Sequence, residues 1–140
     1  MLSGIVAEPL ALLDGVNEVG AHVVADDLSC GWRRVLPPSA APDPYQRLAE
    51  RFMAGPPDPT RADPVDVRVT SLVERLTAAH ARGLVVYDVK FCEPELFYVP
   101  LLRERLAAAG FPVLHVEVEV TDEVPSQTLT RIEAFVETLT

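Results

Sequence analysis

The residues best suited to chemistry lie in one short segment that leads to a cysteine. Residues 84–87 form an apolar run typical of a buried strand, and Cys92 follows after a few residues of loop. Glu93-Pro94 then favours the start of a helix, because proline is well tolerated in the first helical turn. In open parallel α/β sheets ligands bind outside the carboxyl ends of the strands, and a helix start beside a sulfur favours the thiolate. Cys92 is therefore the leading candidate for a metal ligand or a nucleophile.

The same cysteine also has a purely structural interpretation. A cysteine after an apolar strand is most often a small buried hydrophobic residue. Lys90 and the amides that open the helix favour an anionic sulfur, whereas Glu93 and Glu95 oppose part of that effect. On the residues alone, both interpretations of Cys92 stay open.

Two other polar groups of residues have structural interpretations that we favour over functional ones. Asp26 and Asp27 look like part of a metal site, but we expect one of them to cap a turn after the second strand and the other to be solvated. Trp32 with Arg33 and Arg34 has the ring and the charge to bind a nucleotide, but a loop tryptophan that covers the edge of the core is the preferred interpretation.

The last helix of the chain has its own start signals. Thr130 and Glu133 have capping-box spacing, and Ser126 is placed to cap the same helix one turn earlier. Arg131 is equally suited to contact a carboxylate or phosphate and to form an exposed ion pair with an acid such as Glu133 or Glu137. The histidines, at positions 22, 80 and 115, are too dispersed for a metal site.

Composition narrows the class of protein. The chain has 140 residues, is 49% hydrophobic and carries a formal charge of −9, which suits one compact domain with a real core. The acidic balance argues against nucleic acid or an anionic membrane as the main partner. Without a long apolar run or a secretion signal, the protein is expected to be cytoplasmic. In a reducing compartment we expect Cys30 and Cys92 to be free thiols or ligands, not a disulfide.

The elements that must position Cys92 follow from a recurring unit, which is an amphipathic helix, a glycine and a short apolar strand. Strands are expected at residues 2–6, 21–25, 84–87 and 112–116. Helices are expected near residues 8–19, 65–82, 101–109 and 129–139.

This alternation of helices and strands predicts parallel pairing with right-handed crossovers. The predicted fold is a three-layer α/β domain whose four-stranded parallel sheet has the order 2-1-3-4, with helices on both faces. The order reverses between strands 1 and 3, so a crevice is expected between residues 7–8 and 88–92. Residues 37–64 hold eight of the thirteen prolines and one short helix at 43–53. We interpret them as an ordered excursion within a single domain that spans residues 1–140.

Four segments of the chain, taken in order, resemble the C-terminal domain of the subunits of 2-hydroxyacyl-CoA dehydratases and benzoyl-CoA reductases. They are residues 2–5, 20–28, 86–94 and 127–137, and the most specific parts are Lys90-Phe91-Cys92 and the run 130–135. Family subunits carry a four-iron, four-sulfur (4Fe-4S) cluster with three cysteine ligands and one site open to substrate. The resemblance implies that Cys92 is the cofactor-binding and metal-binding residue of this domain. It assigns no role to Cys30, because the family often has its cysteine one position earlier.

The resemblance also implies partners. Family subunits are much longer, and their first half supplies the other cluster cysteines and most acyl-CoA contacts. We therefore expect the chain to act in a dehydratase (a lyase) or a reductase with a complementary subunit or missing N-terminal half, an ATP-dependent electron-donating activator and an acyl-CoA substrate. Alone, it is expected to be inactive and without a cluster, leaving Cys92 a reactive, accessible thiol. The alternative is a non-catalytic α/β binding or assembly module that has lost the cluster.

Overall fold

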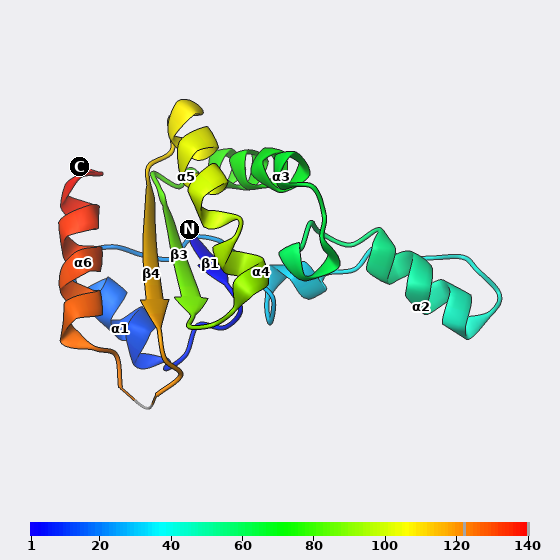
Figure 1. Ribbon diagram of the computed structural model, residues 1–140, viewed down its shortest axis with the longest axis horizontal. Coiled ribbons are helices and arrows are strands. Elements are labelled where there is room, and N and C mark those ends of the chain that lie inside the picture. The colour runs from blue at the N-terminus through cyan, green and yellow to red at the C-terminus, as the bar shows by residue number, and fades with distance from the viewer. Residues whose placement is uncertain (122, 140) are drawn as a thin grey trace.

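A computed structural model describes residues 1–121 and 123–139, and these residues contain a four-stranded parallel sheet (Figure 1). The strands are β1 (Leu2–Gly4), β2 (Asp26–Leu28), β3 (Leu84–Val89) and β4 (Val113–Val118). Their order is β2-β1-β3-β4, and each neighbouring pair is parallel. The predicted fold class and strand order are confirmed.

Six helices are described, and four of them cover the two faces of the sheet. They are α1 (Ala11–Glu18), α2 (Pro44–Met53), α3 (Val65–Ala78), α4 (Glu93–Leu96), α5 (Val99–Ala108) and α6 (Ser126–Glu137), with short 3-10 turns at η1 (Trp32–Arg34) and η2 (Pro59–Arg61). Helices α3 and α5 pack on one face, and α1 and α6 pack on the other (Figure 1). Among the described residues, none of these helices combines the length and apolarity needed to cross a bilayer.

The central strand β3 explains why two layers of helices are needed. Successive side chains of a strand point to opposite faces of the sheet. Leu84 and Val86 enter the core under α3 and α5, whereas Tyr87 enters the core under α1 and α6. A strand buried on both faces reads as a continuous apolar run, which is why β3 was legible in the sequence.

The second strand lies later in the chain than predicted. Residues 21–25 were expected to form it, but β2 is Asp26–Leu28, and Val24 is 56% exposed. Pairing begins with Leu2 opposite Asp26, and the Leu2 amide donates to the Ala25 carbonyl at 3.1 Å. Two adjacent aspartates indicated a turn because carboxylates are rarely buried in strands. Here Asp27 is buried in β2 because long-range arginines compensate its charge, as described below.

The predicted caps of the last helix are wrong. Helix α6 begins at Ser126, its cap position is Pro125, and no side chain caps it. The Thr130 hydroxyl instead donates to the Ser126 carbonyl from within the helix, at 3.1 Å. Proline at the boundary restricts the backbone dihedral without a capping side chain.

The proline-rich excursion of residues 37–64 contains the predicted helix, α2, and the turn η2. In Figure 1 α2 projects away from the sheet on an arm formed by its flanking segments. Near η2, Asp58 Oδ2 lies 3.7 Å from Arg33 Nη1, which anchors the base of this arm to the body of the molecule. The assignment of residues 1–140 to a single domain stays a prediction.

The amino terminus makes a testable contribution to stability. The Met1 α-amine donates to the Gly83 carbonyl at 2.9 Å, and burial lowers its pKa from 8.0 to about 6. Between these values the unfolded chain binds more protons than the folded chain, so stability should fall as the pH is lowered from about 8 to about 6. For the chain with a free α-amine we expect a loss of roughly 2 to 3 kcal/mol, measured by urea unfolding across this range. An acetylated amino terminus should lack this component, and an unchanged pH profile after acetylation would contradict the prediction.

Candidate functional site

Cys92 lies just past the carboxyl end of β3, as predicted, at the cap position of α4. Its amide donates to the Val89 carbonyl at 3.1 Å, and its own carbonyl accepts from the amides of Glu95 and Leu96. Between strand and helix the chain turns at Phe91, whose φ of 67° is left-handed and whose side chain is 90% exposed. The thiol is half-buried in this turn.

The surroundings of Cys92 in the folded chain do not favour a thiolate. Burial raises the pKa of the Cys92 thiol, and the carboxylates of Glu95 and Asp88 raise it further. The Glu95 amide and the Arg33 guanidinium act in the opposite direction but do not prevail. Lys90 is directed elsewhere, with its Nζ 2.8 Å from Glu119 Oε1. The balance of these effects favours the neutral thiol over the thiolate.

A protonated, half-buried thiol should react slowly, in contrast to the reactive Cys92 expected from the sequence. We expect iodoacetamide at neutral pH to modify Cys92 more slowly than Cys30, which is exposed. Mass spectrometry of the native chain measures both rates, and the urea-unfolded chain, where the two rates should converge, is the control. Faster modification of Cys92 than of Cys30 in the native chain would contradict the assignment.

Both cysteines are free thiols, as predicted. Cys30 follows β2, and its amide donates to the Ile5 carbonyl at 3.0 Å. It therefore shares the carboxyl edge of the sheet with Cys92, on a different loop.

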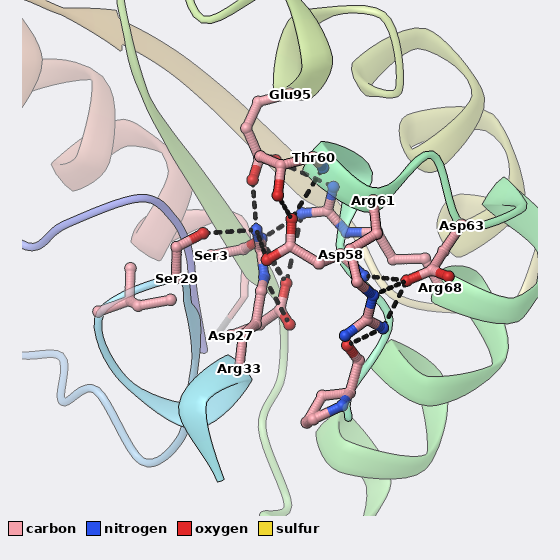
Figure 2. A network of polar contacts seen from close by, with 12 residues as sticks. Ser3, Asp27, Ser29, Arg33, Asp58, Thr60, Arg61, Asp63, Arg68 and Glu95 are labelled. Carbon is pink, nitrogen blue, oxygen red and sulfur yellow. Dashed lines mark hydrogen bonds and ion pairs between the residues drawn. The ribbon is translucent and has the colours of Figure 1, made fainter. Parts of the chain in front are cut away.

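A cluster of four buried charges supports this edge of the sheet (Figure 2), and we call it the buried ion cluster. It consists of Asp27, Arg33, Arg68 and Glu95, each at most 5% exposed. Asp27 Oδ2 lies 3.0 Å from Arg33 Nη2 and 3.3 Å from Arg68 Nη2. Glu95 Oε2 lies 2.9 Å from Arg68 Nη1, and Glu95 Oε1 contacts Arg33 Nη1. Two cations face two anions, so the buried charges balance.

The buried ion cluster ties together elements that are far apart in the sequence. Asp27 lies in β2, Arg33 in η1, Arg68 in α3 and Glu95 in α4. The Ser3 hydroxyl, from β1, donates to Asp27 Oδ2 at 2.7 Å. Because Cys92 caps α4 and Glu95 lies within it, the cluster fixes the position of the thiol relative to the strands.

Electrostatics favour the charged form of this cluster. Burial alone would lower the pKa of Arg33, but Coulombic attraction and hydrogen bonds from Asp27 and Glu95 raise it above its ordinary value. A buried charge is tolerated only when it is paired and hydrogen-bonded. Removing one member would leave its partners buried without compensation.

The sequence prediction for the two aspartates was half right. Asp26 caps a turn as expected, with its Oδ1 accepting from the amides of Leu28 at 3.1 Å and Trp32 at 2.8 Å. The other aspartate was expected to be solvated, but Asp27 is only 4% exposed and belongs to the buried ion cluster. The roles of Arg33, Arg68 and Glu95 were missed. The available signal was Arg68 itself, an arginine within the apolar stripe of α3.

The other candidate residues have structural contacts. The Arg75 guanidinium lies 3.8 Å from the centre of the Trp32 ring, so that ring is already covered. Arg131 Nη2 donates to the His115 carbonyl at 2.7 Å, and His115 Nε2 lies 3.1 Å from Asp88 Oδ2. Since Arg33 is buried, the nucleotide-binding interpretation of residues 32–34 has no support in the geometry.

The residues that the structure describes do not form a complete metal-cluster site. A four-iron cluster takes about four ligands, mostly thiolates. Within residues 1–121 and 123–139, no group of three or more histidine, cysteine, aspartate or glutamate side chains is arranged to hold a metal ion. The described residues therefore do not by themselves supply the ligand set of such a cluster.

A mostly apolar cavity of about 350 Å³ lies at the other end of the sheet. It is lined by Leu2 and Val85 at the start of β1 and β3, and by Leu12 and Ile132 from the covering helices. Because these are the amino-terminal ends of the strands, the cavity is separate from the Cys92 region.

Comparison with known proteins gives consistent matches over the chain. The family model for the D-component of 2-hydroxyglutaryl-CoA dehydratase matches residues 1–139. The (R)-phenyllactyl-CoA dehydratase beta subunit of Clostridium sporogenes is 34% identical over 139 residues, which are 98% of this chain and 37% of the relative. The lactoyl-CoA dehydratase subunit beta of Anaerotignum propionicum is 30% identical, over 99% of this chain and 38% of the relative.

A third relative is more distant. The (R)-2-hydroxyglutaryl-CoA dehydratase subunit beta of Acidaminococcus fermentans is 27% identical over 99% of this chain and 38% of its own length. The chain thus spans less than two fifths of the length of the curated relatives that it matches.

Proposed function

Because this chain belongs to the family of the 2-hydroxyglutaryl-CoA dehydratase D-component, we propose that it forms the part of a 2-hydroxyacyl-CoA dehydratase that presents Cys92 to an iron–sulfur cluster. The observation that carries this proposal is the placement of Cys92. It lies at the carboxyl edge of a parallel sheet, where ligands of this class of fold bind, on a helix held by the buried ion cluster.

In this proposal the chain positions one ligand and does not hold the cluster alone. A metal ligand must be deprotonated, so cluster binding at Cys92 would release the proton that burial favours in the free thiol. The remaining thiolates come from a complementary polypeptide, either another subunit or the rest of the same subunit. The proposed electron donor is an ATP-dependent activator.

The proposed substrate class is a 2-hydroxyacyl-CoA thioester, which is the class that the names of the three relatives share. The cations at this edge of the sheet are already paired with carboxylates, so they are poorly available to bind the phosphates of coenzyme A. Arg33 and Arg68 are paired with buried carboxylates, and Lys90 is paired with Glu119. We therefore propose that the complementary polypeptide makes most of the phosphate contacts.

A graft tests the proposal. The chain replaces the matched segment of the Clostridium sporogenes beta subunit, and the hybrid is co-expressed with the other subunits of that dehydratase and purified without oxygen. We expect the isolated chain to be colourless and free of iron, and the hybrid to carry about four irons per beta subunit. Iron analysis and visible absorbance give the result, and circular dichroism confirms folding.

Two outcomes would overturn the proposal. An isolated chain with a stable cluster would show that the other ligands lie within it. A folded, assembled hybrid without iron would favour the alternative of a non-catalytic module that has lost the cluster.

A further inference from the structure

Helix α2 turns its apolar side chains toward solvent. Tyr45, Leu48 and Phe52 are 83%, 60% and 49% exposed, and their spacing places them on one face of the helix. Met53, beside this face, is 69% exposed, and no residue of α2 is buried. A surface helix of a globular protein normally buries its apolar stripe, whereas this face stays largely exposed and its Phe52 ring is partly covered by the Arg61 guanidinium, 5.3 Å from the ring centre.

The polar side of α2 faces its own chain. Arg51 Nε donates to the Pro37 carbonyl at 3.0 Å, and the Ser39 hydroxyl donates to Glu50 Oε2. Gln46 Nε2 donates to Glu50 Oε1 at 2.8 Å. These contacts join the polar side of α2 to residues 37–39, and the helix itself lies away from the sheet (Figure 1).

The start of α2 is well specified. The Asp43 side chain accepts from the Gln46 amide at 2.8 Å, and Pro44 occupies the first helical position. Ten residues are nevertheless too few for a stable isolated helix, because most helical stability in proteins comes from packing of the apolar face. The apolar face of α2 is therefore suited to pack against another protein surface.

We propose that this surface is α2 of a second copy of the chain, so that two copies dimerise through their apolar α2 faces. This inference does not depend on the proposed function. The exposed parts of Tyr45, Leu48, Phe52 and Met53 amount to roughly 500 Å² per copy, because such side chains offer about 150–250 Å² each. Two such faces bury at most on the order of 1,000 Å² in total, which is below the ~1,200–2,000 Å² of stable interfaces and in the range of weak, reversible ones.

The face is complementary to itself when the two helices are antiparallel. A two-fold axis between residues 48 and 49 places Tyr45 level with Phe52 of the second copy, and Leu48 level with Ala49. An aromatic ring of one copy then packs against an aromatic ring of the other at each end of the interface. At its centre, the leucine side chain of one copy packs against the smaller alanine of the other. Such isologous contacts close as a dimer and do not propagate into a fibre.

The charge distribution permits this pairing despite the acidity of the chain. Residues 37–64 contain three arginines and four acids, a net charge of −1 of the total of −9. Because the arm projects from the body (Figure 1), the acidic bodies of two copies lie apart, and their repulsion is screened over about 8 Å at physiological salt.

The test begins with sedimentation velocity of the intact chain under reducing conditions. We expect a reversible monomer–dimer equilibrium that Leu48→Asp shifts toward monomer by at least about tenfold in dissociation constant. Leu10→Asp makes the same change at a leucine that is 73% exposed outside the arm, and it should leave the equilibrium unchanged. Far-ultraviolet circular dichroism establishes that both variants fold.

Cross-linking tests the register. In a background of Cys30→Ser and Cys92→Ser, mild oxidation should convert Leu48→Cys to a covalent dimer, because residue 48 lies beside the two-fold axis. Met53→Cys lies farther from the axis and should cross-link much less. A wild-type chain that is monomeric at every concentration would overturn the proposal. The same conclusion holds if this chain stays monomeric by itself and binds only the complementary polypeptide used with the graft. A dimer that survives Leu48→Asp would also overturn it.

Discussion

Replacing Arg33 with methionine is expected to remove about 3 to 5 kcal/mol of stability, because Asp27 and Glu95 would stay buried with one cation fewer. This is a large part of the 5 to 15 kcal/mol by which a domain is normally stable. Methionine keeps much of the volume of the side chain, so the loss reports mainly on charge and hydrogen bonding. Urea unfolding followed by circular dichroism measures the change.

Arg34→Met is the matched control for this prediction. Arg34 is exposed and its Nε donates to the Ser29 carbonyl at 3.1 Å, so its replacement should change stability by no more than about 0.5 kcal/mol. Equal stability of the two variants would show that the buried ion cluster contributes nothing.

Substitution of Gly4 by alanine is expected to cost about 3 kcal/mol or more, or to prevent folding. Gly4 ends β1 with a φ of 143°, and a Cβ atom there would lie 2.1 Å from the carbonyl oxygen of Tyr87. Gly4 pairs with Tyr87 across β1 and β3, so neither backbone can yield without separating the strands. Separation of β1 from β3 would disturb the part of the sheet directly under the candidate site.

Gly110→Ala separates this clash from backbone strain alone. Gly110 also has a positive φ, 86°, but a Cβ atom there would meet nothing within 4 Å. Its replacement should cost only about 1 to 2 kcal/mol, the strain of a left-handed residue with a side chain. Expression yield and urea unfolding of both variants give the comparison, and similar losses would contradict the close approach of Gly4 to β3.

Local patterns predicted the framework of the molecule. The recurring unit of helix, glycine and strand led to four parallel strands in the order 2-1-3-4, and the apolar run of residues 84–87 located β3 and therefore Cys92. These features were predictable because the hydrophobic periodicity and the helix boundaries depend on residues that are close together in the sequence. The same reasoning misplaced β2, because the apolar residues 21–25 precede the strand that actually pairs.

The supporting charges could not be predicted in this way. Arg33 and Glu95 are 62 positions apart, and their pairing depends on how β2, η1 and α4 converge. Asp27 was misread as solvated because an isolated carboxylate does belong in water. The pKa of the Cys92 thiol could not be predicted for a related reason, since it depends on burial and on acids brought near by folding.

The most direct test of the central claim is the iron content of the grafted subunit with each cysteine replaced in turn. The claim is that Cys92, and not Cys30, is the cluster ligand contributed by this chain. We expect Cys30→Ser to keep about four irons per beta subunit and Cys92→Ser to lose most of them, with both hybrids folded and assembled. Equal iron in the two hybrids, or loss confined to Cys30→Ser, would contradict the account.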